Sequence, residues 1–287
     1  MTIDKQTDPL VAVARRTRSG DLWRMGPHLL LCGDSTDPDT VLRLMDGEVA
    51  DLVVTDPPYG VSYVGKPTLR RPIANDSLTN ERLRSLLIGA FASWPLKSGG
   101  SFYVCAPTGA TQLEFRIALN DAGLQLRQSL AWVKHQFVIS RSDYQNKHET
   151  ILYGWKDGAR HRFFGGRRQT TVWEHAKPHK SSWHPTAKPV ALVSQAIENS
   201  SLPNEIIFDG FGGGGSVLIA CEALGRKSCI IEIDPAYCDA TMARWEEATG
   251  QSAVLIPSKP AFSRAPLKNS FAGERRRSRA RSGEANP

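Results

Sequence analysis

Short apolar runs alternate with helical patterns between residues 28 and 250, and this alternation limits the possible folds more than any other feature. Typical buried strands are HLLLCGD (28–34), DLVVT (51–55), SFYVCA (101–106), EIIFD (205–209) and KSCIIEID (227–234). Helical patterns of about 10–15 residues separate them, and strands are also expected at 124–135 and 149–155. Such a chain is predicted to form an α/β fold with a mostly parallel sheet and helices on both faces.

Four of these predicted strands end in unusual motifs: GD at 33–34, DPPY at 56–59, DGFGGGGS at 209–216 and EID at 232–234. The carboxyl ends of parallel strands meet at one edge of a sheet, and ligands of such sheets bind there. The sequence therefore predicts one site built from all four motifs.

The limits of the folded part follow from composition. Residues 1–20 are polar and irregular, and 257–287 are rich in Ser, Pro, Arg and Gly, so we expect both ends to be disordered around a domain at 21–256. The chain contains no run of 18 apolar residues and no apolar core near its start, which predicts a cytoplasmic protein without a membrane span. Five scattered cysteines are typical of reduced thiols, and no metal site is expected.

A glycine pattern points to the cofactor. Gly210, Gly212 and Gly215 satisfy G-x-G-x-x-G between a strand and a helix, and Glu232 ends the next strand. Glycines let a backbone approach a ligand closely, and an acid at that place can hold ribose hydroxyls, so an adenosine-containing cofactor is expected. Asp209 would repel a pyrophosphate but suits the ammonium of S-adenosylmethionine. A nicotinamide-dependent oxidoreductase remains the alternative of another class.

The DPPY stretch is suited to a reaction at an exocyclic amine of a nucleobase. Such an amine is a poor nucleophile because its lone pair is delocalised into the ring. The Asp56 carboxylate and the Pro57 carbonyl could accept its two N–H bonds, and the prolines would fix their directions. Tyr59 offers a ring on which a base taken out of its duplex can stack.

Together these motifs resemble the β-group of S-adenosylmethionine-dependent DNA amino-methyltransferases. The resemblance rests on TDPPYG (55–60), HPTAKPVALV (184–193), FDGFGGGGS (208–216) and IEIDPAYCDA (231–240), and it covers about residues 20–250. It implies a Rossmann-like fold with a circularly permuted motif order, in which the catalytic motif precedes the cofactor motif. Gly210 and Gly214 stand where the family usually has Pro and Ser.

The resemblance also implies a role for each motif residue. The catalytic residues would be Asp56, Pro57, Pro58 and Tyr59. S-adenosylmethionine would be bound by Asp34, Asp56, Thr186, Lys188, Asp209, Phe211, Gly213, Gly215 and Glu232. The target-recognition insert would lie at about 156–183, between the two motifs.

Charge indicates a polyanionic partner, expected to be double-stranded DNA. Residues 134–188 hold eleven Lys/Arg against four Asp/Glu, and 257–287 hold eight against two. The predicted nucleic-acid contacts are Lys66, Arg70, Arg71, Arg160, Arg162, Arg167, Arg168, Lys177 and Lys180. A homodimer and a cognate restriction endonuclease are left open as partners, and so is a bacterial or phage origin.

The resulting hypothesis is transfer of a methyl group to N6 of a flipped adenine. Asp at the first position of DPPY favours adenine, since the cytosine-N4 members more often carry Ser there, and a cytosine-N4 enzyme is the alternative. A third hypothesis, a DNA-binding module with an inactive centre, is disfavoured by the intact Asp56 and Tyr59.

Overall fold

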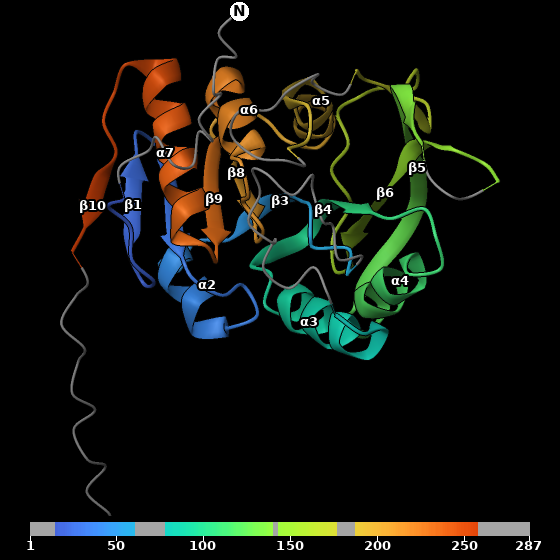
Figure 1. Cartoon of the computed structure of the whole chain (residues 1–287), viewed down its shortest axis with the longest axis horizontal. Coiled ribbons are helices and arrows are strands. Elements are labelled where there is room, and N and C mark those ends of the chain that lie inside the picture. The colour runs from blue at the N-terminus through green and yellow to red at the C-terminus, as the bar shows by residue number, and fades with distance from the viewer. Residues whose placement is uncertain (1–14, 61–77, 140–142, 177–186, 258–287) are drawn as a thin grey trace, which may run out of the picture. The chain divides into compact units, whose positions relative to one another are not determined.

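In the computed structural model, residues 15–60, 78–139, 143–176 and 187–257 are described. The strands are β1 (Leu22–Met25), β2 (His28–Cys32), β3 (Ala50–Thr55), β4 (Leu96–Ala106), β5 (Leu124–Val138), β6 (Asn146–Lys156), β7 (Val172–Glu174), β8 (Ile206–Asp209), β9 (Lys227–Glu232) and β10 (Val254–Ile256). The helices are α2 (Pro38–Met45), α3 (Asn80–Ala92), α4 (Gln112–Asp121), α5 (Val190–Ser200), α6 (Ser216–Leu224) and α7 (Pro235–Thr249) (Figure 1).

The described strands form one sheet in the order β10-β1-β2-β9-β8-β3-β4-β6-β5-β7. Its centre, β2-β9-β8-β3-β4, is entirely parallel. Antiparallel pairs extend both sides: β1 and β10 beyond β2, and the β6–β5 hairpin beyond β4, where β7 adds in parallel to β5. The predicted mostly parallel sheet is confirmed, and the central strands are buried apolar runs because helices cover both of their faces.

Helices cover both faces of the sheet, as predicted (Figure 1). On one face α2, α3 and α4 pack on the central strands around Phe91, Phe102 and Phe115, which are fully buried or nearly so. On the other face α5 and α6 form a second core cluster, and α6 and α7 form a third around Trp245. The parallel centre is therefore fixed from both sides, which holds the carboxyl ends of its strands in place.

Helix starts follow the sequence closely. The side chain of Asp37 caps α2 and that of Asp234 caps α7, each with Pro as the next residue. The strands β1, β7 and β10 were not predicted, because each has only three or four residues and a short edge strand carries little periodicity. Strand β4 begins at Leu96, five residues before the predicted start, and passes through Gly99 and Gly100.

Parts of several predictions lie outside the described residues. These are residues 1–14, residues 61–77 with the predicted contacts Lys66, Arg70 and Arg71, the end of the 156–183 insert and the tail after 257. Residues 15–20 were expected to be disordered, but the Thr17 hydroxyl donates to Asp239 Oδ1 at 2.5 Å and Thr17 is buried, so this stretch is ordered. In the described part of the chain, no helix has the length and apolar character needed to cross a membrane.

Candidate active site

The four unusual strand ends meet at one edge of the sheet. Strands β2, β9, β8 and β3 are neighbours and parallel, so Asp34, Glu232, Asp209 and Asp56 all follow or end strands at the same edge. The Thr55 hydroxyl donates to Asp209 Oδ1 at 2.7 Å, which joins the DPPY strand to the glycine strand. The structure therefore brings together the motifs that the sequence analysis singled out.

The glycine loop between β8 and α6 is packed too closely for larger residues. A Cβ at position 212 would lie 2.4 Å from Ile230 Cγ2, and Gly213 and Gly215 have φ angles of 50° and 72°. Helix α7 holds the loop from behind, where the Thr241 hydroxyl donates to the Gly213 carbonyl at 2.9 Å. The result is a backbone surface at the start of α6 that a ligand can approach.

Two buried carboxyls flank this loop. Asp209 Oδ1 also accepts from the Phe211 N–H at 3.0 Å, and Glu232 accepts from the N–H groups of Gly213 at 2.7 Å and Asp234 at 2.8 Å. Burial raises the pKa of both carboxyls to about 7. A cation beside Asp209 and hydroxyls beside Glu232 would stabilise the ionised forms, so the pair suits a ligand with those groups. Phe211 is half-buried beside the loop.

Asp34 lies at the same edge, but it is exposed. Its Oδ1 accepts from the backbone N–H of Thr36 at 2.9 Å and from the Thr36 hydroxyl at 2.8 Å. The preceding Gly33 N–H donates to the Glu232 carbonyl at 2.9 Å, which fixes the GD turn beside β9.

The DPPY turn places an acid and a phenol together. The Tyr59 hydroxyl lies 3.2 Å from Asp56 Oδ1, and its ring packs edge-on against Phe115 at a centroid distance of 6.0 Å. Pro57 is buried, and Pro58 is half-buried. Burial raises the pKa of Asp56 although the ammonium of Lys188 opposes that effect.

Lys188 joins the two halves of the site. Its backbone carbonyl accepts from the Ser216 hydroxyl at 2.8 Å, which ties it to the start of α6 as expected for a residue beside the cofactor loop. Its ammonium, however, points to the catalytic turn and lies 2.5 Å from Asp56 Oδ2. Thr186, predicted next to it, lies outside the described residues.

Two charged residues of the site were missed by the sequence analysis. Glu149 on β6 accepts from the Tyr59 hydroxyl at 3.1 Å through Oε2, and its Oε1 lies 2.5 Å from the ammonium of Lys134 on β5. Both residues lie in segments predicted as strands, and in an apolar strand a charged residue is itself unusual. The two charged residues could therefore have been noticed in the sequence, but the sequence does not show that their strands pair.

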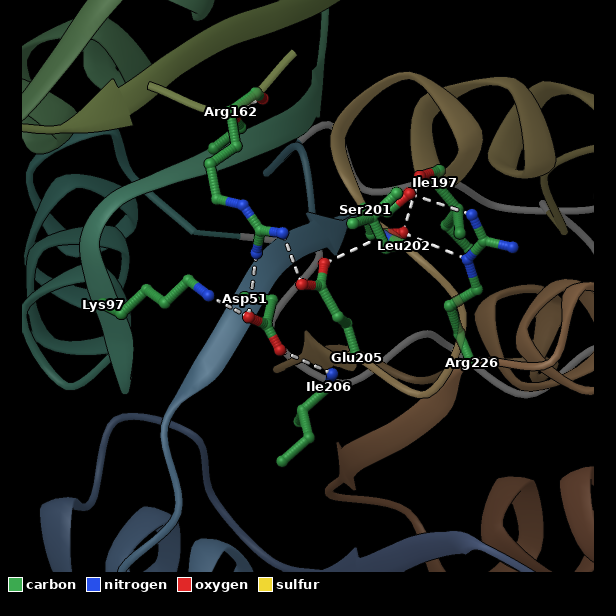
Figure 2. Close-up of polar contacts among 10 residues, drawn as sticks. Asp51, Lys97, Arg162, Ile197, Ser201, Leu202, Glu205, Ile206 and Arg226 are labelled. Atoms are coloured by element: carbon green, nitrogen blue, oxygen red, sulfur yellow. Dashed lines mark hydrogen bonds and ion pairs between the residues drawn. The ribbon is translucent and has the colours of Figure 1, made fainter. Parts of the chain in front are cut away.

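The first part of the described insert lies away from this edge, whereas β7 at its end pairs with β5 at the level of Glu149. In the first part, Arg162 pairs with Asp51 at the start of β3 and with Glu205 just before β8, and Asp51 also pairs with Lys97 at the start of β4 (Figure 2). The Arg162 carbonyl accepts from the Ser101 hydroxyl. Ser101 lies five residues before Ala106, the last residue of β4, so about 16 Å of strand separates it from the carboxyl edge. Arg162 therefore holds the amino edge of the sheet together, and its contact with nucleic acid stays a prediction.

Three of the other predicted nucleic-acid residues, Arg160, Arg167 and Arg168, lie in the described part of the chain. The Arg160 carbonyl lies against Gly99 in the first half of β4, and Arg167 lines a cavity of about 290 Å³ between the sheet and the end of α5, lined also by Tyr103, Tyr153, Trp173 and Asn199. Arg168, the next residue, is exposed. Lys66, Arg70, Arg71, Lys177 and Lys180 lie outside the described residues.

The end of the β5–β6 hairpin extends past the catalytic edge instead. Strand β4 ends at Ala106 opposite Thr150, whereas β5 and β6 continue pairing to Val138 and Asn146. Beyond Glu149 the hairpin carries Phe137, Ile139 and Tyr144, which are 56%, 84% and 91% exposed. Apolar and aromatic side chains this exposed, next to a reactive edge, are typical of a surface that contacts a partner.

All five cysteines are buried and form no disulfide. Among the described residues, no group of three His, Cys, Asp or Glu side chains is arranged to hold a metal ion.

Comparison with known proteins gives a consistent result. Residues 50–243 match the family described as DNA methylase, which comprises N6 and N4 methyltransferases. The type II methyltransferase M.HpaI of Haemophilus parainfluenzae is 24% identical over 243 residues, covering 75% of this chain and 73% of that protein. M.ScaI of Streptomyces caespitosus, also a type II methyltransferase, is 24% identical over 277 residues, covering 84% and 89%.

Solved structures share the fold. The M1.HpyAVI–SAM complex superposes with a TM-score of 0.56 at 20% identity, covering 75% of this chain and 97% of that one. The cytosine-N4-specific PvuII DNA methyltransferase gives a TM-score of 0.58 at 16% identity, covering 74% and 85%. The predicted Rossmann-like architecture is thereby confirmed.

Proposed function

Because the chain belongs to the DNA methylase family of N6 and N4 methyltransferases, we propose that it methylates N6 of adenine in double-stranded DNA. The observation that carries this proposal is the contact between the two motifs: Asp56 and Asp209 are joined through Thr55, so an amine acceptor and a cation-binding acid lie side by side. Methyl transfer to an amine requires a binding site for the amine next to a binding site for the cationic methyl donor.

The residues at the glycine loop fit S-adenosylmethionine. Asp209 suits its ammonium, Glu232 its ribose hydroxyls, and the close-packed Gly212 and Gly215 leave backbone at the surface. The same Asp209 is unfavourable for the pyrophosphate of a nicotinamide cofactor, which argues against the oxidoreductase alternative. When bound, S-adenosylmethionine supplies a methyl group on a positively charged sulfur.

The DPPY residues prepare the amine. Asp56 and the Pro57 carbonyl accept its N–H bonds, so the nitrogen lone pair is turned out of the ring system and towards the methyl carbon. Transfer would form a nitrogen–carbon bond as the carbon–sulfur bond of the donor breaks, with the bonding electrons left on sulfur, and Asp56 would take the proton that the amine releases. Burial, which raises the pKa of this carboxyl, favours its taking that proton.

We place the DNA on the carboxyl edge of the sheet, against the end of the β5–β6 hairpin. The exposed Phe137, Ile139 and Tyr144 lie beyond Glu149 on this hairpin and could stack on bases or fill the gap left by a flipped one. The adenine preference rests on Asp56 as the first residue of DPPY. We further propose that the protein acts in the cytoplasm of a bacterium, because the type II methyltransferases it is similar to come from bacteria.

Sequencing that detects modified bases tests the proposal directly. DNA from cells expressing the protein should carry N6-methyladenine in one short sequence context, and DNA from cells expressing Asp56→Ala should carry none. N4-methylcytosine without N6-methyladenine would replace the adenine assignment with the cytosine alternative. No modified base, together with binding of NAD by the purified protein, would overturn the methyltransferase function.

A further inference from the structure

The catalytic turn lies in a closed set of charges. Asp56 and Glu149 supply two carboxylates, and Lys134 and Lys188 supply two ammonium groups, while Tyr59 lies between the acids. Both lysine side chains are less than 10% exposed. A buried ammonium without a carboxylate is costly, so each lysine must keep a partner through the reaction.

In the free protein both carboxylate oxygens of Asp56 already have a donor. Its Oδ2 lies 2.5 Å from the Lys188 ammonium, and its Oδ1 lies 3.2 Å from the Tyr59 hydroxyl. An amine at Asp56 Oδ2 would compete with the Lys188 ammonium, and as the amine becomes cationic the two positive charges would repel each other. The mechanism above therefore favours a second acceptor for Lys188.

Glu149 is that acceptor by distance. Its Oε2 already lies 3.4 Å from the Lys188 ammonium, so a small rotation of the lysine side chain converts this contact into the main one. Its Oε1 is held by Lys134, which fixes the carboxylate in place. Burial raises the pKa of Glu149, but the two lysines more than compensate and lower it to about 2, so Glu149 stays charged.

We propose that Glu149 is a positioning residue that receives the Lys188 ammonium when the target amine binds, and so frees Asp56. This rests on the proposed amine methylation. The exchange keeps every charge paired. The amine becomes cationic during transfer and replaces Lys188 as the positive partner of Asp56. Lys188 stays paired with Glu149. In the free protein, the Lys188 ammonium thus occupies the position beside Asp56 that the target amine takes during the reaction.

The test measures the single-turnover rate of methyl transfer with Glu149→Gln. Without the carboxylate, Lys188 stays on Asp56, so the rate should fall at least about tenfold while the dissociation constants for S-adenosylmethionine and DNA change little. Adding Lys188→Met should make E149Q/K188M faster than E149Q, because the ammonium that blocks Asp56 is gone. A merely structural Glu149 would make the double variant no faster than the single one, and that result overturns the proposal.

The pH dependence gives a second readout. The titratable groups around Asp56 are Tyr59, Cys105, Glu149, Lys188 and Asp209, with Lys134 behind Glu149. In E149Q the persistent Lys188 pair lowers the pKa of Asp56, so the acidic limb of the rate profile should move to lower pH, and in E149Q/K188M it should move to higher pH. An unmoved limb in both variants contradicts the exchange.

The controls separate the possible failures. Glu149→Asp keeps a carboxylate and should recover part of the rate, whereas Glu174→Gln, an exposed acid on β7, should change nothing. Glu149→Gln also leaves Lys134 without a carboxylate and should lower the melting temperature, so cooperative unfolding well above the assay temperature is the evidence that a slow variant is folded. An inactive wild type would overturn the proposed function itself, whereas an active wild type with an equally active E149Q would overturn only the role of Glu149.

Discussion

Asp209 and Glu232 make cofactor binding depend on pH near neutrality. Burial raises the pKa of each to about 7 in the free protein, while the ammonium and hydroxyls of S-adenosylmethionine favour the ionised carboxylates. Binding should therefore release protons below about pH 7, and the dissociation constant should fall as the pH rises from about 6 to about 8. Calorimetry in two buffers of different ionisation enthalpy measures the released protons.

The same groups act on stability with the opposite sign. Their folded pKa values lie above the ordinary values of 3.8 and 4.5, so their contribution to the stability of the free protein is fully present below about pH 4 and is lost as the pH rises through about 7.

Asp209→Asn should remove a large part of the proton release on cofactor binding. A dissociation constant independent of pH in the wild type would contradict the assignment of these acids to the cofactor.

At the scale of single residues, the sequence predicts which site residues lie together when they follow parallel strands. It does not predict site residues whose position depends on the pairing of antiparallel strands. Asp56, Asp209 and Glu232 could be placed together because every parallel strand of the sheet ends at the same edge. Glu149 and Lys134 come from an antiparallel hairpin, whose register is not visible in one chain. Lys188 was assigned to the right neighbourhood, but its side chain turns to Asp56 and not to the cofactor loop.

Arg162 makes the charged contacts that attach the segment between β6 and β7 to the fold, next to the stacking of His161 on Trp155 and the hydrogen bond from the Phe164 N–H to the Asn199 carbonyl. Arg162 bridges Asp51 and Glu205 and thereby connects the segment to the starts of β3 and β8 (Figure 2). Charge alone could not distinguish this role from a DNA contact, because a basic residue count does not tell which edge of the sheet a loop crosses. The pattern of apolar residues does not place this segment either, because the segment has no helical or strand periodicity.

Arg162→Met should lower the free energy of unfolding by about 2 kcal/mol, because it leaves the partly buried Glu205 without its cation, while Asp51 keeps only Lys97. The cost is below that of a fully buried pair, since the three side chains keep 15–22% exposure. Denaturant titration measures it. The matched control is Arg127→Met, which removes the exposed pair with Asp157 and should cost less than about 1 kcal/mol. Equal costs for the two variants would refute the anchoring role.

For the whole molecule, the structure separates the reactive edge of the sheet from the edge that carries Arg160 and Arg162 of the insert. If DNA contacts the carboxyl edge, Phe137→Ala with Tyr144→Ala should weaken DNA binding about fivefold to tenfold, because two exposed rings at that edge are lost. The paired control, Arg160→Ala with Arg168→Ala, should leave binding within about twofold. Fluorescence anisotropy with a duplex containing the target context measures both. Weaker binding in the arginine pair alone would move the DNA to the opposite edge.

The basic residues after position 257 contribute charge without any need for a fixed structure. This segment holds eight Lys/Arg against two Glu. Phosphate contacts made by such residues release counterions, so each lost contact lowers the slope of log affinity against log salt by about 0.9. A chain ending at residue 257 should therefore bind DNA more weakly at low salt, with a smaller slope. Because every proposed catalytic and cofactor residue precedes this point, its single-turnover rate at saturating DNA should equal that of the full chain. An unchanged salt slope would show that the segment makes no phosphate contacts, and an altered rate would show that it acts on the catalytic step.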